Sequence, residues 1–99
     1  MPDHRDDVAI ITGGTRGIGA AIAGALAARG ARLVLNGRNR DPEVDAAIAD
    51  LRGLTEVELD LGDAADPATA ARLVALARSR FGRVDYVVPG CGPPAAGTT

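Results

Sequence analysis

Three glycines near the amino terminus stand at a spacing suited to holding a phosphate group. Gly13, Gly17 and Gly19 fall within the string Thr-Gly-Gly-Thr-Arg-Gly-Ile-Gly of residues 12–19. Residues without a Cβ let a turn bend sharply and let a pyrophosphate approach the backbone. An apolar run at 8–11 precedes the string and a helical pattern follows it, so the positive end of a helix dipole would face the anion. The sequence therefore predicts a phosphate-binding turn between a strand and a helix.

The glycine spacing separates this string from two other phosphate loops. It reads G-x-x-x-G-x-G rather than G-x-G-x-x-G, and it lacks the Gly-Lys-Ser/Thr ending of nucleotide hydrolases. The string resembles the cofactor loop of the classical short-chain dehydrogenase/reductase family, and the resemblance extends over residues 7–92. It implies that six loop residues contact the cofactor: Gly13, Thr15, Arg16, Gly17, Ile18 and Gly19. The alternative is that the glycines only mark a turn between strand and helix.

The residues that end the second predicted strand bear on which dinucleotide binds. NAD-binding folds carry an acidic residue about twenty residues past the loop, whereas a basic residue accommodates the extra phosphate of NADP. This chain has Asn36, then a glycine and Arg38. Arg38 and Arg16 can clamp a phosphate dianion between two guanidinium groups, and the resemblance is to NADP-preferring members. NADP(H) is thus the expected cofactor. NAD(H) stays an alternative if Asp41 takes the ribose hydroxyls, and Arg38 and Arg40 can instead be solvated loop charges.

Further cofactor contacts are implied by the resemblance alone. Asp60 and Leu61 follow the third predicted strand, where the family carries Asp and then an apolar residue. The resemblance implies that Asp60 meets the adenine amino group and that Leu61 lines the adenine pocket, although Asp60 is equally suited to a turn or cap. The family's Asn-Asn-Ala-Gly after the fourth strand reads Pro-Gly-Cys-Gly at 89–92, so only Gly92 matches and the amide contacts are not carried over. Cys91 is expected to be a small buried residue rather than a catalytic thiol.

No residue of the chain is assigned a catalytic role. The resemblance implies hydride transfer between the cofactor and a carbonyl or alcohol carbon, with a Tyr acid/base, a Lys that lowers its pKa and a Ser that polarises the carbonyl. The chain has no lysine, Tyr86 falls in the fourth predicted strand, and Ser79 falls on a helix. Tyr86 is expected to be core or strand filler. We therefore expect the amino-terminal, cofactor-binding half of an oxidoreductase, inactive by itself, as a fragment or a truncated reading frame.

Hydrophobic periodicity predicts one incomplete α/β domain over residues 1–99, with loose tails at 1–6 and 93–99. Four predicted strands alternate with three predicted helices in the order 7–12, 17–29, 32–36, 42–52, 55–59, 67–81 and 84–88. This series predicts right-handed crossovers and a truncated Rossmann-type, doubly wound parallel sheet in the strand order 3-2-1-4. The third strand alternates polar and apolar residues, which favours an edge position, whereas the first two strands are continuously apolar.

Local signals also predict how the helices begin and pack. Asp-Pro pairs at 41–42 and 66–67 are typical of an N-cap followed by proline at the first helical position. The first helix is expected to turn one apolar face to the sheet, made by Ile18, Ile22 and Leu26. Gly24 within this helix is expected to be small because the helix packs closely on the sheet there.

Composition excludes several classes of partner. A net charge of −2 gives no bulk attraction to nucleic acid or an anionic membrane, and one cysteine forms no disulfide within the chain. No apolar run approaches the length of a membrane span, and the amino terminus is not that of a signal peptide. The expected location is the cytoplasm. The expected partners are a dinucleotide, a carbonyl or alcohol substrate in a full-length parent, and a second copy in a homo-oligomer.

Two other classes of function stay open at this point. The first is a non-catalytic dinucleotide- or partner-binding module that completes its sheet along the fourth strand, whose apolar edge invites pairing. The second is a nucleotide binder or a methyl-transfer enzyme with an adenosyl cofactor. The arginines near the glycine loop argue against the second class, because such a cofactor carries no phosphate.

Overall fold

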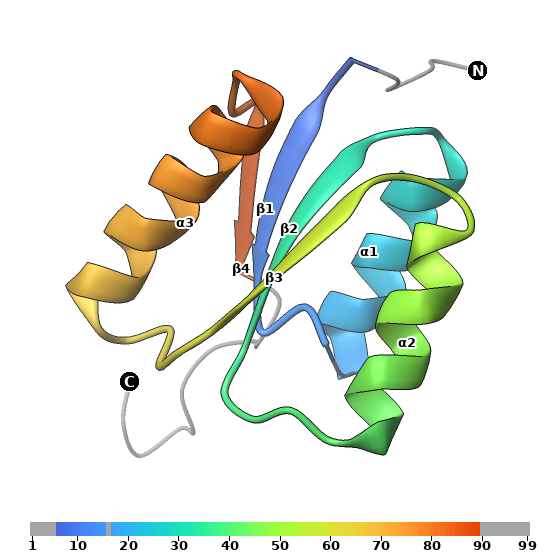
Figure 1. Cartoon of the computed structure of the whole chain (residues 1–99), viewed down its shortest axis with the longest axis horizontal. Coiled ribbons are helices and arrows are strands. Elements are labelled where there is room, and N and C mark those ends of the chain that lie inside the picture. Colours follow the sequence, from blue (N-terminus) through green and yellow to red (C-terminus); the bar gives the residue numbers. More distant parts are fainter. Residues whose placement is uncertain (1–5, 16, 90–99) are drawn as a thin grey trace.

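The computed structural model describes residues 6–15 and 17–89, which form a parallel sheet with helices on both faces. The elements are β1 (Val8–Thr12), α1 (Gly17–Ala28), β2 (Arg32–Gly37), α2 (Pro42–Arg52), β3 (Val57–Leu61), α3 (Pro67–Phe81) and β4 (Tyr86–Pro89). The strands pair in parallel in the order β3-β2-β1-β4 (Figure 1). The predicted fold class and strand order are confirmed.

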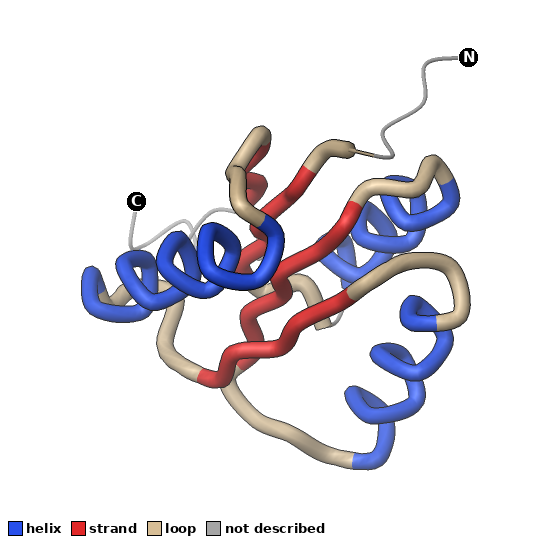
Figure 2. Tube along the Cα trace, turned by 45° about the horizontal axis from the view of Figure 1, so that its top comes forward, coloured by secondary structure: helices blue, strands red, loops and turns tan. Residues whose placement is uncertain are grey.

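The helices lie in two layers, with α1 and α2 on one face of the sheet and α3 on the other (Figures 1 and 2). Successive residues of β1 point to opposite faces, so Ala9 and Ile11 join the core under α1 and α2, while Val8 and Ile10 join the core under α3. A central strand covered on both sides must be apolar at every position. This explains the unbroken apolar runs of β1 and β2.

The two Asp-Pro pairs begin helices as predicted. An Asp41 side-chain oxygen accepts a hydrogen bond from the backbone N–H of Val44 at 2.9 Å, and Asp66 accepts one from Ala68 at 2.9 Å. In each case a proline follows at the start of the helix, where its missing N–H has no intrahelical partner to lose. The carboxylates therefore fix where α2 and α3 begin.

The third and fourth strands begin later than the sequence pattern indicates. Thr55 donates its backbone N–H to the carbonyl of Leu51 at 3.0 Å, so this residue belongs to the turn that follows α2 rather than to β3. β3 starts at Val57 and pairs with β2 as far as Leu61, which places Asp60 within the strand rather than after it. β4 likewise starts at Tyr86 rather than at 84.

The face that α1 turns to the sheet agrees only in part with the prediction. Ile22 and Leu26 are partly buried and pack against the core, whereas Ile18 is 68% exposed. The fully buried residues of the helix are the small ones, Gly19, Ala23 and Ala27. Small residues at this spacing let the helix lie close to the sheet, which rotates Ile18 toward solvent. Gly24 is not the point of close packing that was expected, because a Cβ built there meets no atom within 4 Å among the described residues.

Candidate functional site

The glycine loop joins β1 to α1 at the carboxyl end of the sheet, and its glycines are needed for different physical reasons. Gly13 and Gly17 have φ of 64° and 58°, in the left-handed region that favours glycine. Gly19 is needed for space. A Cβ built on it would lie 2.3 Å from the carbonyl oxygen of Gly13, so the first turn of α1 rests directly on the loop backbone. The predicted turn is present, and the first turn of α1 packs closely against it.

Asn36 joins three chain segments beneath this loop. The residue is 1% exposed, and its side-chain oxygen accepts a hydrogen bond from Gly13 N–H at 3.3 Å. Its side-chain nitrogen donates to the carbonyl of Gly62 at 3.0 Å, and its backbone carbonyl accepts from Gly14 N–H at 3.0 Å. The loop, the end of β2 and the residue after β3 are therefore held together by one amide. A polar residue ending an apolar strand was the sequence signal for this role.

The positively charged residues after β2 differ in their surroundings. Arg38 is exposed, and no hydrogen bond or ion pair of its guanidinium occurs among residues 6–15 and 17–89. Arg40 instead forms an ion pair with Asp45, with 2.6 Å between Nε and Oδ1. Asp41 uses a carboxylate oxygen to cap α2. Of the candidates after β2, Arg38 is thus the cation best able to meet a ligand.

Three residues named by the sequence analysis lie outside the described part of the chain. They are Arg16, Cys91 and Gly92. The clamp of Arg16 with Arg38, the buried setting of Cys91 and the cofactor contact of Gly92 stay predictions.

Asp60 lies at the carboxyl end of β3 and pairs with a residue that sequence reasoning missed. Arg72 of α3 donates from Nη2 to Asp60 Oδ2 at 3.0 Å and from the same nitrogen to the carbonyl of Leu61 at 3.3 Å. The hydrogen bond and charge of Asp60 raise the pKa of Arg72. Asp60 is therefore neither a turn nor a cap residue. Leu61 is 42% exposed beside it, at the same edge as the glycine loop.

Tyr86 lies at the opposite, amino-terminal edge of the sheet. It is the first residue of β4, is 41% exposed and donates its hydroxyl hydrogen bond to Asp7 at 3.1 Å. The expectation that it fills the core is wrong, although it does lie in the strand. Ser79 donates to the carbonyl of Leu76 within α3 at 3.4 Å.

The hydrogen bond to Asp7 is expected to affect the titration of Tyr86. The hydrogen bond and the negative charge of Asp7 raise the pKa of Tyr86 above its ordinary value of 10.0. Because the folded-state pKa is the higher one, this contact stabilises the fold below pH 10.0, and its contribution is lost as the pH rises through the folded-state pKa. The chain has one tyrosine and no tryptophan, so phenolate absorbance reports this group alone.

We expect Asp7→Asn to lower the pKa of Tyr86 toward 10.0 in that absorbance titration. The matched control is Asp6→Asn, which removes a neighbouring carboxylate and should leave the titration almost unchanged. Equal pKa values in the wild type and in the Asp7 variant would contradict the assignment.

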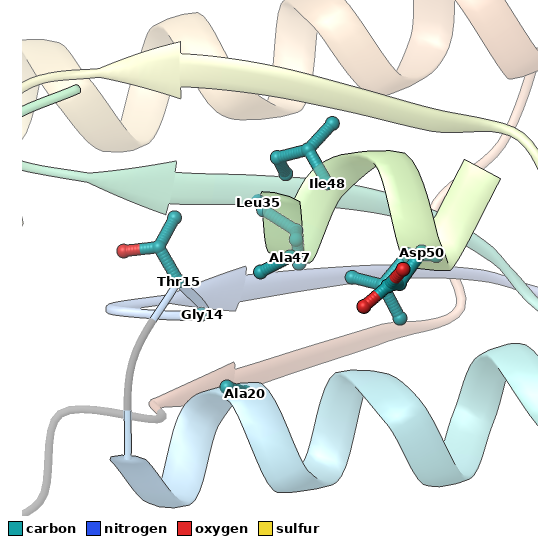
Figure 3. A pocket seen from close by; sticks show the side chains of 8 residues that line it. Gly14, Thr15, Ala20, Leu35, Ala47, Ile48 and Asp50 are labelled. Atoms are coloured by element: carbon teal, nitrogen blue, oxygen red, sulfur yellow. The ribbon is translucent and has the colours of Figure 1, made fainter. Parts of the chain in front are cut away.

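A pocket of about 190 Å³ lies behind the loop, between α1 and α2 (Figure 3). Gly14 and Thr15 form its wall on the loop side, and apolar side chains of β2 and α2 form most of the rest. Such a lining does not suit a phosphate, which needs N–H donors or cations. A phosphate group therefore fits the exposed side of the loop rather than this pocket.

Two features are absent from residues 6–15 and 17–89. No helix there is long and apolar enough to cross a membrane. No group of three or more His, Cys, Asp or Glu side chains there is arranged to hold a metal ion.

The fold and the geometry of the glycine loop agree with the family to which known proteins relate this chain. A family model described as short chain dehydrogenase matches residues 7–99. The chain belongs to the short-chain dehydrogenase family. This confirms the family suggested by the glycine string. Members of this family are oxidoreductases that use NAD or NADP.

Individual short-chain dehydrogenases resemble the chain over most of its length. It is 42% identical over 93 residues to a protein of Streptomyces violaceoruber named as ketoacyl reductase 1 of the granaticin polyketide synthase, covering 93% of the chain and 34% of that protein. The chain thus spans about a third of the length of the curated relatives it matches.

Solved structures of the family superpose well on the chain. L-sorbose reductase from Gluconobacter frateurii, complexed with NADPH and L-sorbose, gives a TM-score of 0.83 at 34% identity, over 94% of this chain and 36% of that one. A 3-oxoacyl-[acyl-carrier protein] reductase from Brucella melitensis in complex with NAD gives 0.76 at 40% identity, over 91% and 35%.

Proposed function

We propose that this chain is the cofactor-binding portion of a short-chain oxidoreductase that prefers NADP(H) and accepts NAD(H) less well. The observation that carries the proposal is the glycine loop, whose backbone is packed against α1 at Gly19 and tied by Asn36 to the ends of β2 and β3. A loop held in this way at a helix start, where the first backbone N–H groups of the helix have no intrahelical partner, suits a pyrophosphate. The bound dinucleotide would supply or accept the hydride.

The rest of the cofactor would extend from the loop across the ends of β2 and β3. We propose that Gly13, Thr15, Gly17 and the exposed Ile18 contact the pyrophosphate side, with Asn36 supporting the loop from below. The adenine amino group would meet Asp60, with Leu61 beside the ring. Such positions fit a ligand lying along the carboxyl edge of a doubly wound sheet.

The preference for NADP(H) rests on Arg38. The exposed guanidinium after β2 has no ion pair among residues 6–15 and 17–89, which suits the 2′-phosphate of NADP, whereas the ribose of NAD needs an acidic acceptor. Related structures carry NADPH in one case and NAD in another, so family membership alone does not choose between them. Arg16 would add a second cation.

We also propose that these 99 residues bind cofactor without turning over substrate. The chain has no lysine, and Tyr86 lies at the edge of the sheet opposite the glycine loop. A carbonyl or alcohol would be the substrate of a full-length parent in the cytoplasm. A second candidate function is that of a partner-binding module that pairs along β4. The 62% exposure of Val87 in this strand supports it. Light scattering tests it, because such a module would form a discrete dimer or heteromer.

Thermal-shift titration with NADPH and NADH tests the main proposal. A ligand at a hundred times its Kd raises the stability of the folded state by about 2.7 kcal/mol. We expect a larger rise in Tm with NADPH than with NADH at equal concentration, and no NADPH oxidation with a panel of ketones. A melt that neither dinucleotide shifts, or that NADH shifts more, would contradict the proposed site or its preference.

A further inference from the structure

Gly37, the last residue of β2, is a glycine because of space rather than backbone conformation. Among the described residues, the glycines with positive φ are Gly13, Gly17, Gly30 and Gly82, so the backbone at position 37 is open to other residues. A Cβ built on Gly37, however, would lie 2.9 Å from both Cγ2 and Oγ1 of Thr15. Thr15 therefore occupies the volume into which a side chain at position 37 would project.

Thr15 is poorly able to move out of that volume. It is 8% exposed, and a β-branched side chain has few accessible rotamers. The loop before it is also held, because Gly14 donates its backbone N–H to the carbonyl of Asn36 at 3.0 Å and a Cβ on Gly14 would lie 2.9 Å from Leu35. A side chain at position 37 would have to displace the loop itself.

This contact lies where the proposed cofactor ribose would sit. A carboxylate at the end of β2 would accept hydrogen bonds from the ribose hydroxyls of NAD, whereas a 2′-phosphate needs open space and a cation. Gly37 is buried beside Thr15 and carries no side chain that could reach the ribose, and the exposed Arg38 follows it. We propose that Thr15 is a specificity-determining residue, which keeps position 37 free of a side chain and thereby favours NADP over NAD. This inference rests on the proposed dinucleotide site.

The packing part of this proposal is tested without any ligand. Gly37→Ala should lower the Tm by about 5–10 °C, because one methyl group is forced into an occupied volume. Thr15→Ala removes both clashing atoms, so Thr15→Ala/Gly37→Ala should recover most of that loss relative to Thr15→Ala alone. Gly24→Ala is the matched control, since a Cβ there meets open space. An equal loss of Tm from Gly37→Ala with and without Thr15 would overturn the proposal.

The selectivity part is tested by the affinities for NADPH and NADH. Gly37→Asp alone should weaken both dinucleotides, because the loop is displaced. Thr15→Ala/Gly37→Asp should shift the ratio of affinities toward NADH by about tenfold or more, since the carboxylate then has room to face the ribose. Tight NADH binding by Gly37→Asp alone, or no shift in the double variant, would overturn the proposal. If the wild type binds neither dinucleotide, both the proposed function and the selectivity role of Thr15 fail. The Tm values of the Gly37→Ala variants would still show whether Thr15 excludes a side chain at position 37.

Discussion

Replacing Gly19 by alanine is expected to abolish NADPH binding and to lower the free energy of unfolding by about 1–3 kcal/mol. The new methyl group would lie 2.3 Å from the carbonyl oxygen of Gly13, a distance that real Cβ atoms do not reach. Either α1 or the loop must move. The helix is held by Ala23 and Ala27, which are buried against the sheet, so the loop is the part that yields.

The matched control lies on the same helix. Gly24→Ala adds the same methyl group where no described residue outside the helix backbone and the chain neighbours lies within 4 Å, and it should raise the free energy of unfolding by up to about 1 kcal/mol through helix propensity. Chemical denaturation and an NADPH titration of both variants separate the two effects. NADPH affinity of the Gly19 variant equal to that of the wild type would contradict the placement of the pyrophosphate on this loop.

Replacing Arg38 by alanine is expected to weaken NADPH binding by about 10- to 100-fold and to leave NADH binding nearly unchanged. A hydrogen bond to a charged group contributes about 1.5–3 kcal/mol, and only NADPH carries the phosphate that this guanidinium would meet. The loss should be largest at low salt, because the attraction between exposed charges is screened by ions. Isothermal titration calorimetry with both dinucleotides at two ionic strengths measures this loss of affinity and its dependence on salt.

Arg40→Ala is the matched control for this prediction. It removes a neighbouring guanidinium that is already paired with Asp45, so the affinity for NADPH should fall by far less. Arg38→Lys should retain part of the affinity, since a single ammonium replaces a fork of donors. Equal losses of NADPH and NADH affinity in Arg38→Ala would show that Arg38 supports the loop rather than the 2′-phosphate.

Features set by short stretches of chain could be predicted from the sequence. The alternation of apolar runs and helical periods determined the four strands, three helices and parallel order, because each period is a property of one segment. The capping Asp41 and Asp66 act within three residues of their own position, so their roles were also predictable. The spacing of the glycines likewise determined the family and the place of the loop.

The supporting contacts of the site could not be predicted in the same way. Asn36 reaches Gly13 and Gly62 across 23 and 26 residues of sequence, and these partners meet only through the register of β1, β2 and β3. The pairing of Arg72 with Asp60 depends on where β3 ends, which differed by two residues from the pattern. The hydrophobic periodicity of each segment does not specify the register in which two strands pair.

The sequence by itself thus determined a Rossmann-type fold of the short-chain dehydrogenase family, with a glycine loop between β1 and α1. Only the tertiary structure decided which glycines are needed for space. A Cβ added to Gly19 or Gly37 would overlap other atoms, whereas a Cβ added to Gly24 would not, although the sequence shows a glycine at all three positions. The physical reason is that steric exclusion acts between atoms that the fold brings together, here the loop between β1 and α1 against the start of α1 and the end of β2. These distances cannot be read from the spacing of residues along the chain.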